Sequence, residues 1–202
     1  MLNQVLHLHL PTRTSSPVIR TAAITGALAL ALVPAAGAGQ NAQGPQPSPR
    51  PTPAGAFVVE QSVTVPGTPA KAFAAITGDV LPWWDHHLFA NPRRMYLEPR
   101  VGGCFCEVAD SLGGNAVRHA VVTVVDRPNT LRYEGPLGLT GMAVSAVTTY
   151  TFAARGDSTV VKVEFHAAGE LPPGLDAAVD GVWRHFLAER FKPWYERTRG
   201  RR

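Results

Sequence analysis

Residues 175–195 read LDAAVDGVWRHFLAERFKPWY, and this stretch decides the fold because its large apolar side chains recur at helical spacing. Those side chains are Val179, Val182, Trp183, Phe186, Leu187, Phe191 and Trp194. Asp180, Arg184 and Glu189 fall between them at polar positions. The pattern predicts one long amphipathic helix, which Pro193 kinks or ends, and its apolar face requires a second layer to pack against.

The segments before this helix alternate between apolar and polar side chains, which is typical of half-buried strands. We expect strands at residues 94–98, 104–109, 116–125, 131–134, 143–154 and 159–167. One face of the fifth of these strands carries Val144, Ala146, Thr148, Tyr150 and Phe152. In the last strand, Lys162, Glu164 and His166 take the polar face. The linkers are short and rich in turn residues, which favours an antiparallel meander with one apolar face.

The folded part opens with a strand and a short helix. Residues 57–65 alternate as a half-buried strand, and Pro66-Gly67 ends it. Thr68 can cap the next element and Pro69 suits a first helical turn, which predicts a helix at residues 70–77. The expected order is strand, helix, about six further antiparallel strands and one long closing helix. This is an α+β fold with a sheet of about seven strands.

The composition indicates one globular domain with appendages, since the chain has 202 residues and is 45% hydrophobic. Its formal charge of +4 lies at the ends, because residues 39–196 contain 13 basic and 15 acidic residues. A nucleic-acid partner is not expected, since such proteins gather Lys and Arg on a folded face. Two cysteines are too few for a four-cysteine zinc module.

The N-terminal residues resemble an export signal. Arg13 and Arg20 precede an uncharged apolar run at 21–33, and a small-x-small site follows at residues 36–38. We expect residues 1–38 to be a cleaved signal peptide, or an uncleaved membrane anchor as the second choice. Residues 39–56 form a Pro-rich linker, the domain covers 57–196, and a basic tail covers 197–202. The protein is therefore expected to be secreted or periplasmic.

Three features resemble a known superfamily. They are Leu81-Pro-Trp-Trp84, Glu98-Pro-Arg-Val-Gly-Gly103 before a strand, and the closing helix. Together with the element order over residues 57–196 they resemble the START/Bet v 1-like (SRPBCC) superfamily, near its polyketide cyclase/dehydrase and activator-of-Hsp90-ATPase-homologue branch. The resemblance implies a helix-grip fold, in which a curved antiparallel sheet wraps a long C-terminal helix around an apolar cavity for hydrophobic molecules. An Hsp90-activating role would require the cytosol, which the export signal argues against.

We therefore expect the protein to bind a small hydrophobic molecule between sheet and helix, without covalent chemistry, cofactor or metal. The expected ligand-binding residues are Trp83, Trp84, Phe105, Tyr150, Phe152, Trp183 and Phe186. Each of them can serve as cavity wall or as plain core, and the two adjacent tryptophans can form an aromatic lip or pack the helix on the sheet.

Two other function classes remain open. A cyclase or hydratase-type enzyme would use a His, Glu or Asp at the cavity for proton transfer, and Asp85, His86 and His87 are the candidates. The two histidines are adjacent and lack the helical i, i+4 spacing of a zinc pair, so a solvated loop is the simpler interpretation. The third class is a non-catalytic interaction module at the cell envelope, which would show a contiguous exposed apolar patch.

Cys104 and Cys106 pose a separate question. On a regular strand their Cα atoms would lie about 6.5–7 Å apart, at the limit of disulfide geometry, so a bond would need a bulge. We expect buried reduced thiols, with a redox disulfide or a soft-metal site completed by His119 as alternatives. The inward face of this strand is open, and Glu107 would pair with Arg118 or a ligand if buried, although surface pairing is the expected arrangement.

Overall fold

The computed structural model describes residues 54–112 and 114–198. The expected signal peptide or anchor at 1–38 and most of the linker lie outside the described residues, as do the last four residues of the basic tail. Within the described part of the chain, no helix combines the length and the apolar character needed to cross a membrane.

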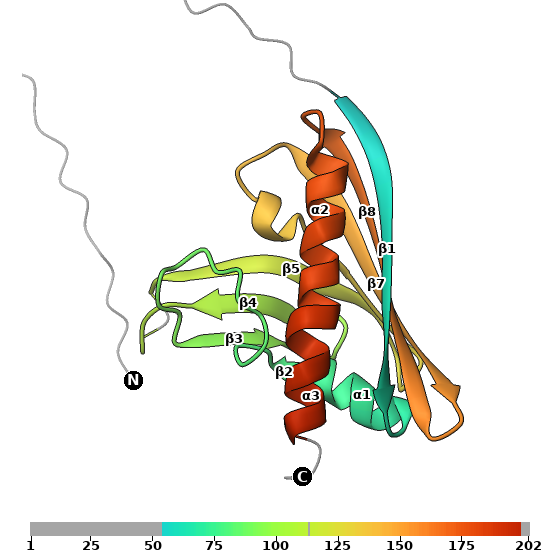
Figure 1. Ribbon diagram of the computed structural model, residues 1–202. Helices are drawn as coiled ribbons and strands as arrows, with labels where there is room; N and C mark the ends of the chain where they lie inside the picture. Colours follow the sequence, from blue (N-terminus) through green and yellow to red (C-terminus); the bar gives the residue numbers. More distant parts are fainter. Residues whose placement is uncertain (1–53, 113, 199–202) are drawn as a thin grey trace, which may run out of the picture. The chain divides into compact units, whose positions relative to one another are not determined.

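One antiparallel sheet of eight strands forms the frame of the domain, in the order β1-β8-β7-β6-β5-β4-β3-β2 (Figure 1). The strands are β1 (Ala54–Pro66), β2 (Gly78–Asp79), β3 (Arg94–Leu97), β4 (Cys104–Val108), β5 (Ala116–Asp126), β6 (Thr130–Glu134), β7 (Val144–Arg155) and β8 (Ser158–Glu170). From β3 to β8 each strand pairs with its successor, so the predicted meander is confirmed. The strand that was not anticipated is the two-residue β2.

The helices lie at the start and the end of the domain. They are α1 (Pro69–Ile76), the 3-10 turn η1 (Leu137–Leu139), α2 (Leu175–Arg184), the π-helical segment η2 (His185–Phe191) and α3 (Lys192–Thr198). The last three follow one another without a break and form the long closing helix that crosses the sheet in Figure 1. Pro193 neither ends nor interrupts it, and it lies where the π-helical segment η2 passes into α3.

Burial follows the predicted alternation. In β7, Val144, Ala146, Thr148, Tyr150 and Phe152 are buried, and the residues between them are half-buried or exposed. The paired strand β8 buries Val161, Val163 and Phe165 on the same face. The closing helix adds Trp183, Phe186, Leu187 and Phe191 to this core. The sheet therefore has one apolar face, and the helix covers it.

The start of the first strand and the end of the closing helix differ from the prediction. The first strand begins at Ala54, inside the segment assigned to the linker, because Ala54–Ala56 pair with Ala168–Glu170. The closing helix runs to Thr198 and thus includes the first two residues of the segment assigned to the tail. Alternation could not reveal the first shift, since these three small residues are exposed and show no pattern.

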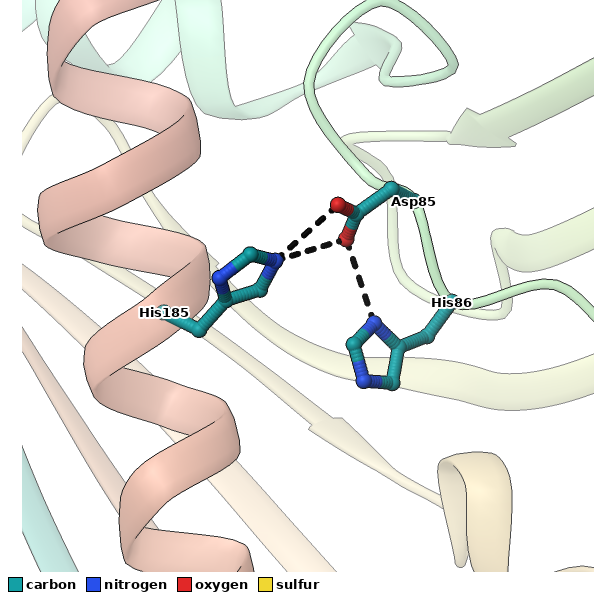
Figure 2. A group of neighbouring side chains, drawn as sticks. All are labelled: Asp85, His86 and His185. Carbon is teal, nitrogen blue, oxygen red and sulfur yellow. Dashed lines mark hydrogen bonds and ion pairs between the residues drawn. The ribbon is translucent and has the colours of Figure 1, made fainter.

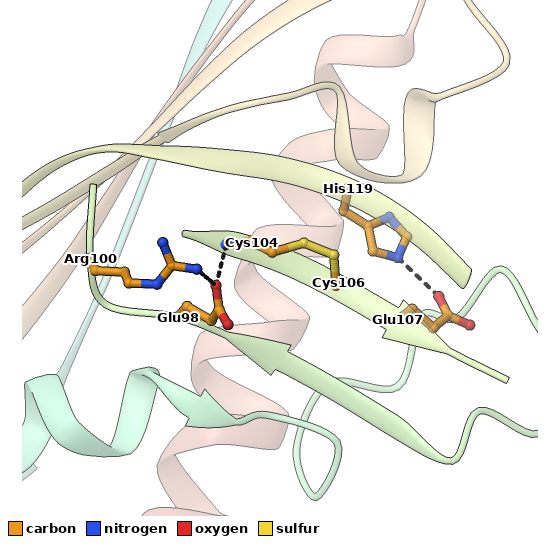
Figure 3. The surroundings of a disulfide bond; sticks show 6 residues. All are labelled: Glu98, Arg100, Cys104, Cys106, Glu107 and His119. Atoms are coloured by element: carbon orange, nitrogen blue, oxygen red, sulfur yellow. Dashed lines mark hydrogen bonds and ion pairs between the residues drawn. A yellow bond between two sulfur atoms is a disulfide. The ribbon is translucent and has the colours of Figure 1, made fainter. Parts of the chain in front are cut away.

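The Glu98–Gly103 turn has a local physical reason for its residues. A Cβ at Gly103 would collide with the backbone oxygens of Glu98 and Arg100, and Gly102 has a φ of +74°. The Glu98 carboxylate accepts a hydrogen bond from the Cys104 amide at 3.0 Å and forms an ion pair with Arg100 at 2.8 Å (Figure 3). Glycine at positions 102 and 103, with the Glu98 carboxylate as hydrogen-bond acceptor, therefore lets the chain turn directly into β4.

The expectation of reduced thiols is wrong, because Cys104 and Cys106 form a disulfide (Figure 3). Their Cα atoms lie 5.4 Å apart, closer than on a regular strand. The register of β4 with β5 shifts between Phe105 and Cys106, and the extra residue of this bulge is His119 on β5, not a residue of β4. The cysteines occupy the half-buried outer face, and Phe105 and Glu107 point into the core.

Candidate functional site

An apolar pocket of ≈ 240 Å³ lies where the closing helix, the η1 turn and β8 meet. Its lining consists of Trp84, His86, Pro136, Leu137, Gly138, Leu139, Phe165, Leu175, Ala178, Val179, Val182, Trp183 and Phe186. Apart from His86 these side chains are apolar or absent, so the interior of the pocket favours a hydrophobic occupant.

Three aromatic side chains form one end of this pocket. The rings of Trp84 and Phe186 stack with centroids 3.9 Å apart, and Trp183 meets both rings edge-on at 6.0 and 5.9 Å. Rings that lock one another in this way keep the helix at a fixed distance from the loop that carries Trp84. This end of the pocket is therefore built from aromatic rings that hold one another in place.

The expected ligand-binding residues separate into two groups. Trp84, Trp183 and Phe186 line the pocket. The other four belong to the packed core around it. Their contacts, with the distance between ring centroids, are Trp83 on Phe191 (5.2 Å), Phe105 on Trp84 (4.9 Å), Tyr150 on Trp183 (6.1 Å) and Phe152 on Phe73 (5.3 Å).

The opposite wall of the pocket comes from a segment that the sequence analysis did not single out. Leu137 and Leu139 of η1 face the helix residues Val179 and Val182 across it. Leu137 has a φ of 52°, a conformation that costs energy in a residue other than glycine. Such strain persists where the surroundings hold it, and here it turns the Leu137 side chain into the pocket wall.

A polar cluster borders the pocket next to His86, and we call it the rim cluster: Asp85, His86, His185, Glu189 and Arg190. Figure 2 shows the first three of these side chains. His185 Nε2 lies 2.9 Å from Asp85 Oδ2, and His86 Nδ1 lies 3.1 Å from Oδ1. Arg190 Nε contacts Asp85 Oδ2 at 3.0 Å. Asp85 thus joins the loop after β2 to a helix that lies a hundred residues later in the chain.

The protonation of the rim cluster follows from these contacts. Burial raises the pKa of Asp85, but hydrogen bonds from His185 and His86 and the charges of His185 and Arg190 outweigh burial and hold the pKa below its ordinary value. Hydrogen bonds to Glu189 and then to Asp85 raise the pKa of His185 against the opposing effect of burial. The cluster is therefore a partly solvated, charge-assisted network, with His86 at the boundary between it and the apolar pocket.

A buried carboxylate holds the loop that carries Asp85 and His86. Glu107 is fully buried and accepts hydrogen bonds from the amides of Leu88 and Phe89 at 2.9 and 2.7 Å and from His119 Nε2 at 2.9 Å (Figure 3). Burial raises the pKa of Glu107, but these donors outweigh it and lower the pKa below its ordinary value. Surface pairing was the wrong expectation for Glu107, because β4 alternates regularly and Glu107 shares the buried face of Phe105.

The π-helical segment begins at His185, which belongs to the rim cluster. In η2 (His185–Phe191) the turns are wider than in an α-helix, and such segments occur often at functional sites. The segment presents His185 to Asp85 while it buries Phe186, Leu187 and Phe191. Local sequence could have indicated one part of this arrangement, since His185 and Glu189 stand at i, i+4 on the predicted helix.

A larger and more open groove of ≈ 530 Å³ runs along β3 and the Glu98–Gly103 turn. Its lining mixes polar and apolar residues, and three of its four arginines already have partners within the domain. Arg94 stacks on Tyr96, Arg100 pairs with Glu98, and Arg127 donates to the Pro99 carbonyl. The apolar pocket is therefore the stronger candidate for a ligand site.

Comparisons with known proteins support the fold. No protein-family model and no curated protein matches the chain. Among solved structures, protein MLL2253 from Mesorhizobium loti is 22% identical, with a TM-score of 0.51 over 70% of this chain and 98% of that one. An AHSA1-like protein from Aeromonas hydrophila (17% identity, TM-score 0.48, 70% and 94%) and the protein Ara h 8.0201 (18%, 0.49, 70% and 98%) are also similar.

The architecture defines an α+β protein in which a curved antiparallel sheet grips one long C-terminal helix. The chain thus has the helix-grip fold of the START/Bet v 1-like superfamily, with eight strands where about seven were expected. The apolar pocket lies between this sheet and the closing helix.

Proposed function

We propose that the protein binds a small hydrophobic molecule in the apolar pocket beneath the closing helix. The observation that carries the proposal is the pocket lining, in which apolar and aromatic side chains surround ≈ 240 Å³ and a single titratable side chain, His86, contributes at the edge. The rim cluster is then the part that would recognise a polar end of the ligand.

The size of the pocket limits the ligand. An apolar cavity of about 150 Å³ can hold benzene, so ≈ 240 Å³ suits a molecule of about two fused rings or a short alkyl chain. Burial of about 200 Å² of apolar ligand surface is worth about 5 kcal/mol before the costs of association. We therefore expect modest affinity for a purely apolar probe, with specificity added by polar contacts at the rim.

We also propose that the protein acts outside the cytoplasm, as a secreted or periplasmic protein. The export pattern before residue 39 supports this, and so does a disulfide between Cys104 and Cys106, since such bonds persist in oxidising compartments. The mass of the protein purified from its own host tests the proposal. A mature chain that begins at Gly39 is the expected result, and an intact N-terminus would support the anchor instead.

The ligand proposal is tested by Ala178→Phe, which places a ring in the pocket from the helix side. Ala177→Phe is the matched control, because both alanines are exposed on the helix but only Ala178 lines the pocket. With 1-naphthylamine as probe and energy transfer from tryptophan as readout, we expect saturable binding that weakens at least tenfold in Ala178→Phe only. Absence of saturable binding, or equal affinity in both variants, would overturn the proposal.

A second function, the cyclase or hydratase-type enzyme, is favoured by one observation. His86 lines the pocket and also contacts Asp85, so a group able to transfer a proton stands within reach of a bound molecule. Native mass spectrometry of protein from its own host would identify a retained molecule. Loss of water from that molecule in the wild type but not in His86→Phe would favour the enzyme, and an unchanged mass would favour the carrier.

A further inference from the structure

Three side chains of the rim cluster have the composition of a metal site. Asp85, His86 and His185 each offer one ligand atom, and these atoms all lie within 4.8 Å of one another. We call them the rim triad (Figure 2). They come from the loop after β2 and from the first residue of η2, so the folded domain, and not local sequence, brings them together.

We propose that the rim triad binds a divalent transition-metal ion of the Zn²⁺ class at the edge of the apolar pocket. Two imidazole nitrogens and one carboxylate oxygen are a donor set that suits zinc and its neighbours, whereas Mg²⁺ and Ca²⁺ prefer oxygen ligands. Three protein ligands also leave one coordination position open, which is how zinc sites that act on small molecules are built.

The spacing of the donor atoms is close to what such an ion requires. Metal bonds of about 2.0–2.2 Å in a tetrahedron separate ligand atoms by about 3.3–3.6 Å. His185 Nε2 and His86 Nδ1 lie 2.9 and 3.1 Å from oxygens of Asp85. The two imidazole nitrogens lie within 4.8 Å of each other, so they need to approach by at most about 1.5 Å, and the His86 side chain is 53% exposed and can turn.

An interaction outside the triad orients one of its ligands. Glu189 Oε2 lies 2.9 Å from His185 Nδ1, so the carboxylate holds the imidazole with Nε2 directed at Asp85. A histidine that binds metal through one nitrogen commonly donates its other N–H to a carboxylate, which fixes the tautomer and the ring orientation. Glu189 is therefore a positioning residue for the proposed site.

Arg190 competes with the ion for Asp85, since its Nε contacts Oδ2 at 3.0 Å. Asp85 has two oxygens, and the one nearest His86, Oδ1, carries no arginine contact. Metal at Oδ1 with Arg190 retained at Oδ2 satisfies both groups. Because His86 also lines the pocket, the open coordination position would meet a ligand oxygen there, and this last step rests on the proposed function.

The test is a titration of the untagged full chain with Zn²⁺ at pH 7.5 by calorimetry, repeated with Co²⁺ for its visible absorption. We expect one site, weakened at least tenfold in His86→Gln and in His185→Gln. His166→Gln is the matched control, since His166 is an exposed histidine paired with a carboxylate, Glu164, at 2.6 Å. Glu189→Gln should weaken binding less than loss of a ligand.

Equal affinity in His185→Gln and His166→Gln, or no binding above buffer, would overturn the metal site. Both triad histidines have side chains that are 30% exposed or more, so these variants should retain the thermal midpoint of the wild type without metal. The 1-naphthylamine assay separates this proposal from the function proposed above. Ala178→Phe should lose the probe and keep Zn²⁺, while His185→Gln should lose Zn²⁺ and keep the probe.

Discussion

Glu107 is the residue on which the geometry of the candidate site depends most. Residues 80–93, the loop that carries Asp85 and His86, are called the rim loop here. The Glu107 carboxylate accepts hydrogen bonds from two amides of the rim loop and from one imidazole N–H of the neighbouring strand, all at 2.9 Å or less. No water competes for these donors, because the side chain is fully buried. Removing the charge leaves buried donors without an equivalent acceptor, which is costly.

Replacement of Glu107 by Gln should destabilise the domain by about 3 kcal/mol, since a Gln amide cannot accept from all three donors. Glu164→Gln is the matched control, because Glu164 also pairs with a histidine on a strand but is exposed. It should change the free energy of unfolding by less than about 1 kcal/mol. Urea unfolding at pH 7 measures both values, and equal effects would show that burial of Glu107 contributes nothing.

The pH dependence of this contribution follows from the lowered pKa of Glu107. A carboxyl with a lower pKa in the folded state stabilises the fold above its unfolded pKa, about 4.3, and loses the contribution as pH falls through the folded value. The stability difference between wild type and Glu107→Gln should be constant from pH 7 to about 5 and should shrink below that. A difference that persists undiminished in acid would contradict the assignment.

Single residues also mark where sequence reasoning succeeds and fails. The alternation of β7 and β8 identifies Tyr150 and Phe152 as inward-facing because each strand is regular and one-sided. The pairing of Asp85 with His185 leaves no local pattern, since it joins residues a hundred positions apart. Leu137 was missed for a related reason, as its backbone conformation becomes visible only in the folded chain.

At the scale of elements, β4 and β5 show which features alternation reveals. β4 alternates regularly, with Phe105 and Glu107 buried and the two cysteines half-buried on the other face. The irregularity is on β5, where the extra residue His119 is buried next to Ala120. Alternation alone could not decide which face of β4 is buried, and it favoured free thiols because residues i and i+2 of a regular strand lie at the limit of disulfide geometry. The helices were easier to predict, because proline and glycine bounded α1 and an apolar stripe marked the closing helix.

The Cys104–Cys106 disulfide should contribute little to stability. A cross-link that closes only three residues removes little entropy from the unfolded chain, which corresponds to about 1.5 kcal/mol. The double variant Cys104→Ser, Cys106→Ser should therefore fold, with a thermal midpoint about 3–6 °C lower. Circular dichroism measures the midpoint, and alkylation followed by mass spectrometry checks the oxidation of the wild type. A variant that fails to fold would show that the bond sets the bulge.

At the scale of the whole domain, the pocket exists because two groups of elements pack on the apolar face of one sheet and leave a space between them. The helix and the rim loop cover one part and meet through stacked rings of Trp84 and Phe186, while the η1 turn covers another. The fold could be inferred from element order, because order and alternation largely determine how such layers close. The pocket itself could not be inferred from the sequence, since its presence depends on how individual side chains fill the space between sheet and helix.

Hydrogen bonds hold the rim loop on two sides, to Glu107 of the sheet and to His185 of the helix. In the described part of the chain, no side-chain hydrogen bond or ion pair holds η1, and Gly138 and Gly141, which follow the strained Leu137, lie in open surroundings. A guest molecule would consequently come and go past η1 rather than past the histidines. Its residence time would be governed by how often that turn swings aside, independently of whatever chemistry the opposite end provides.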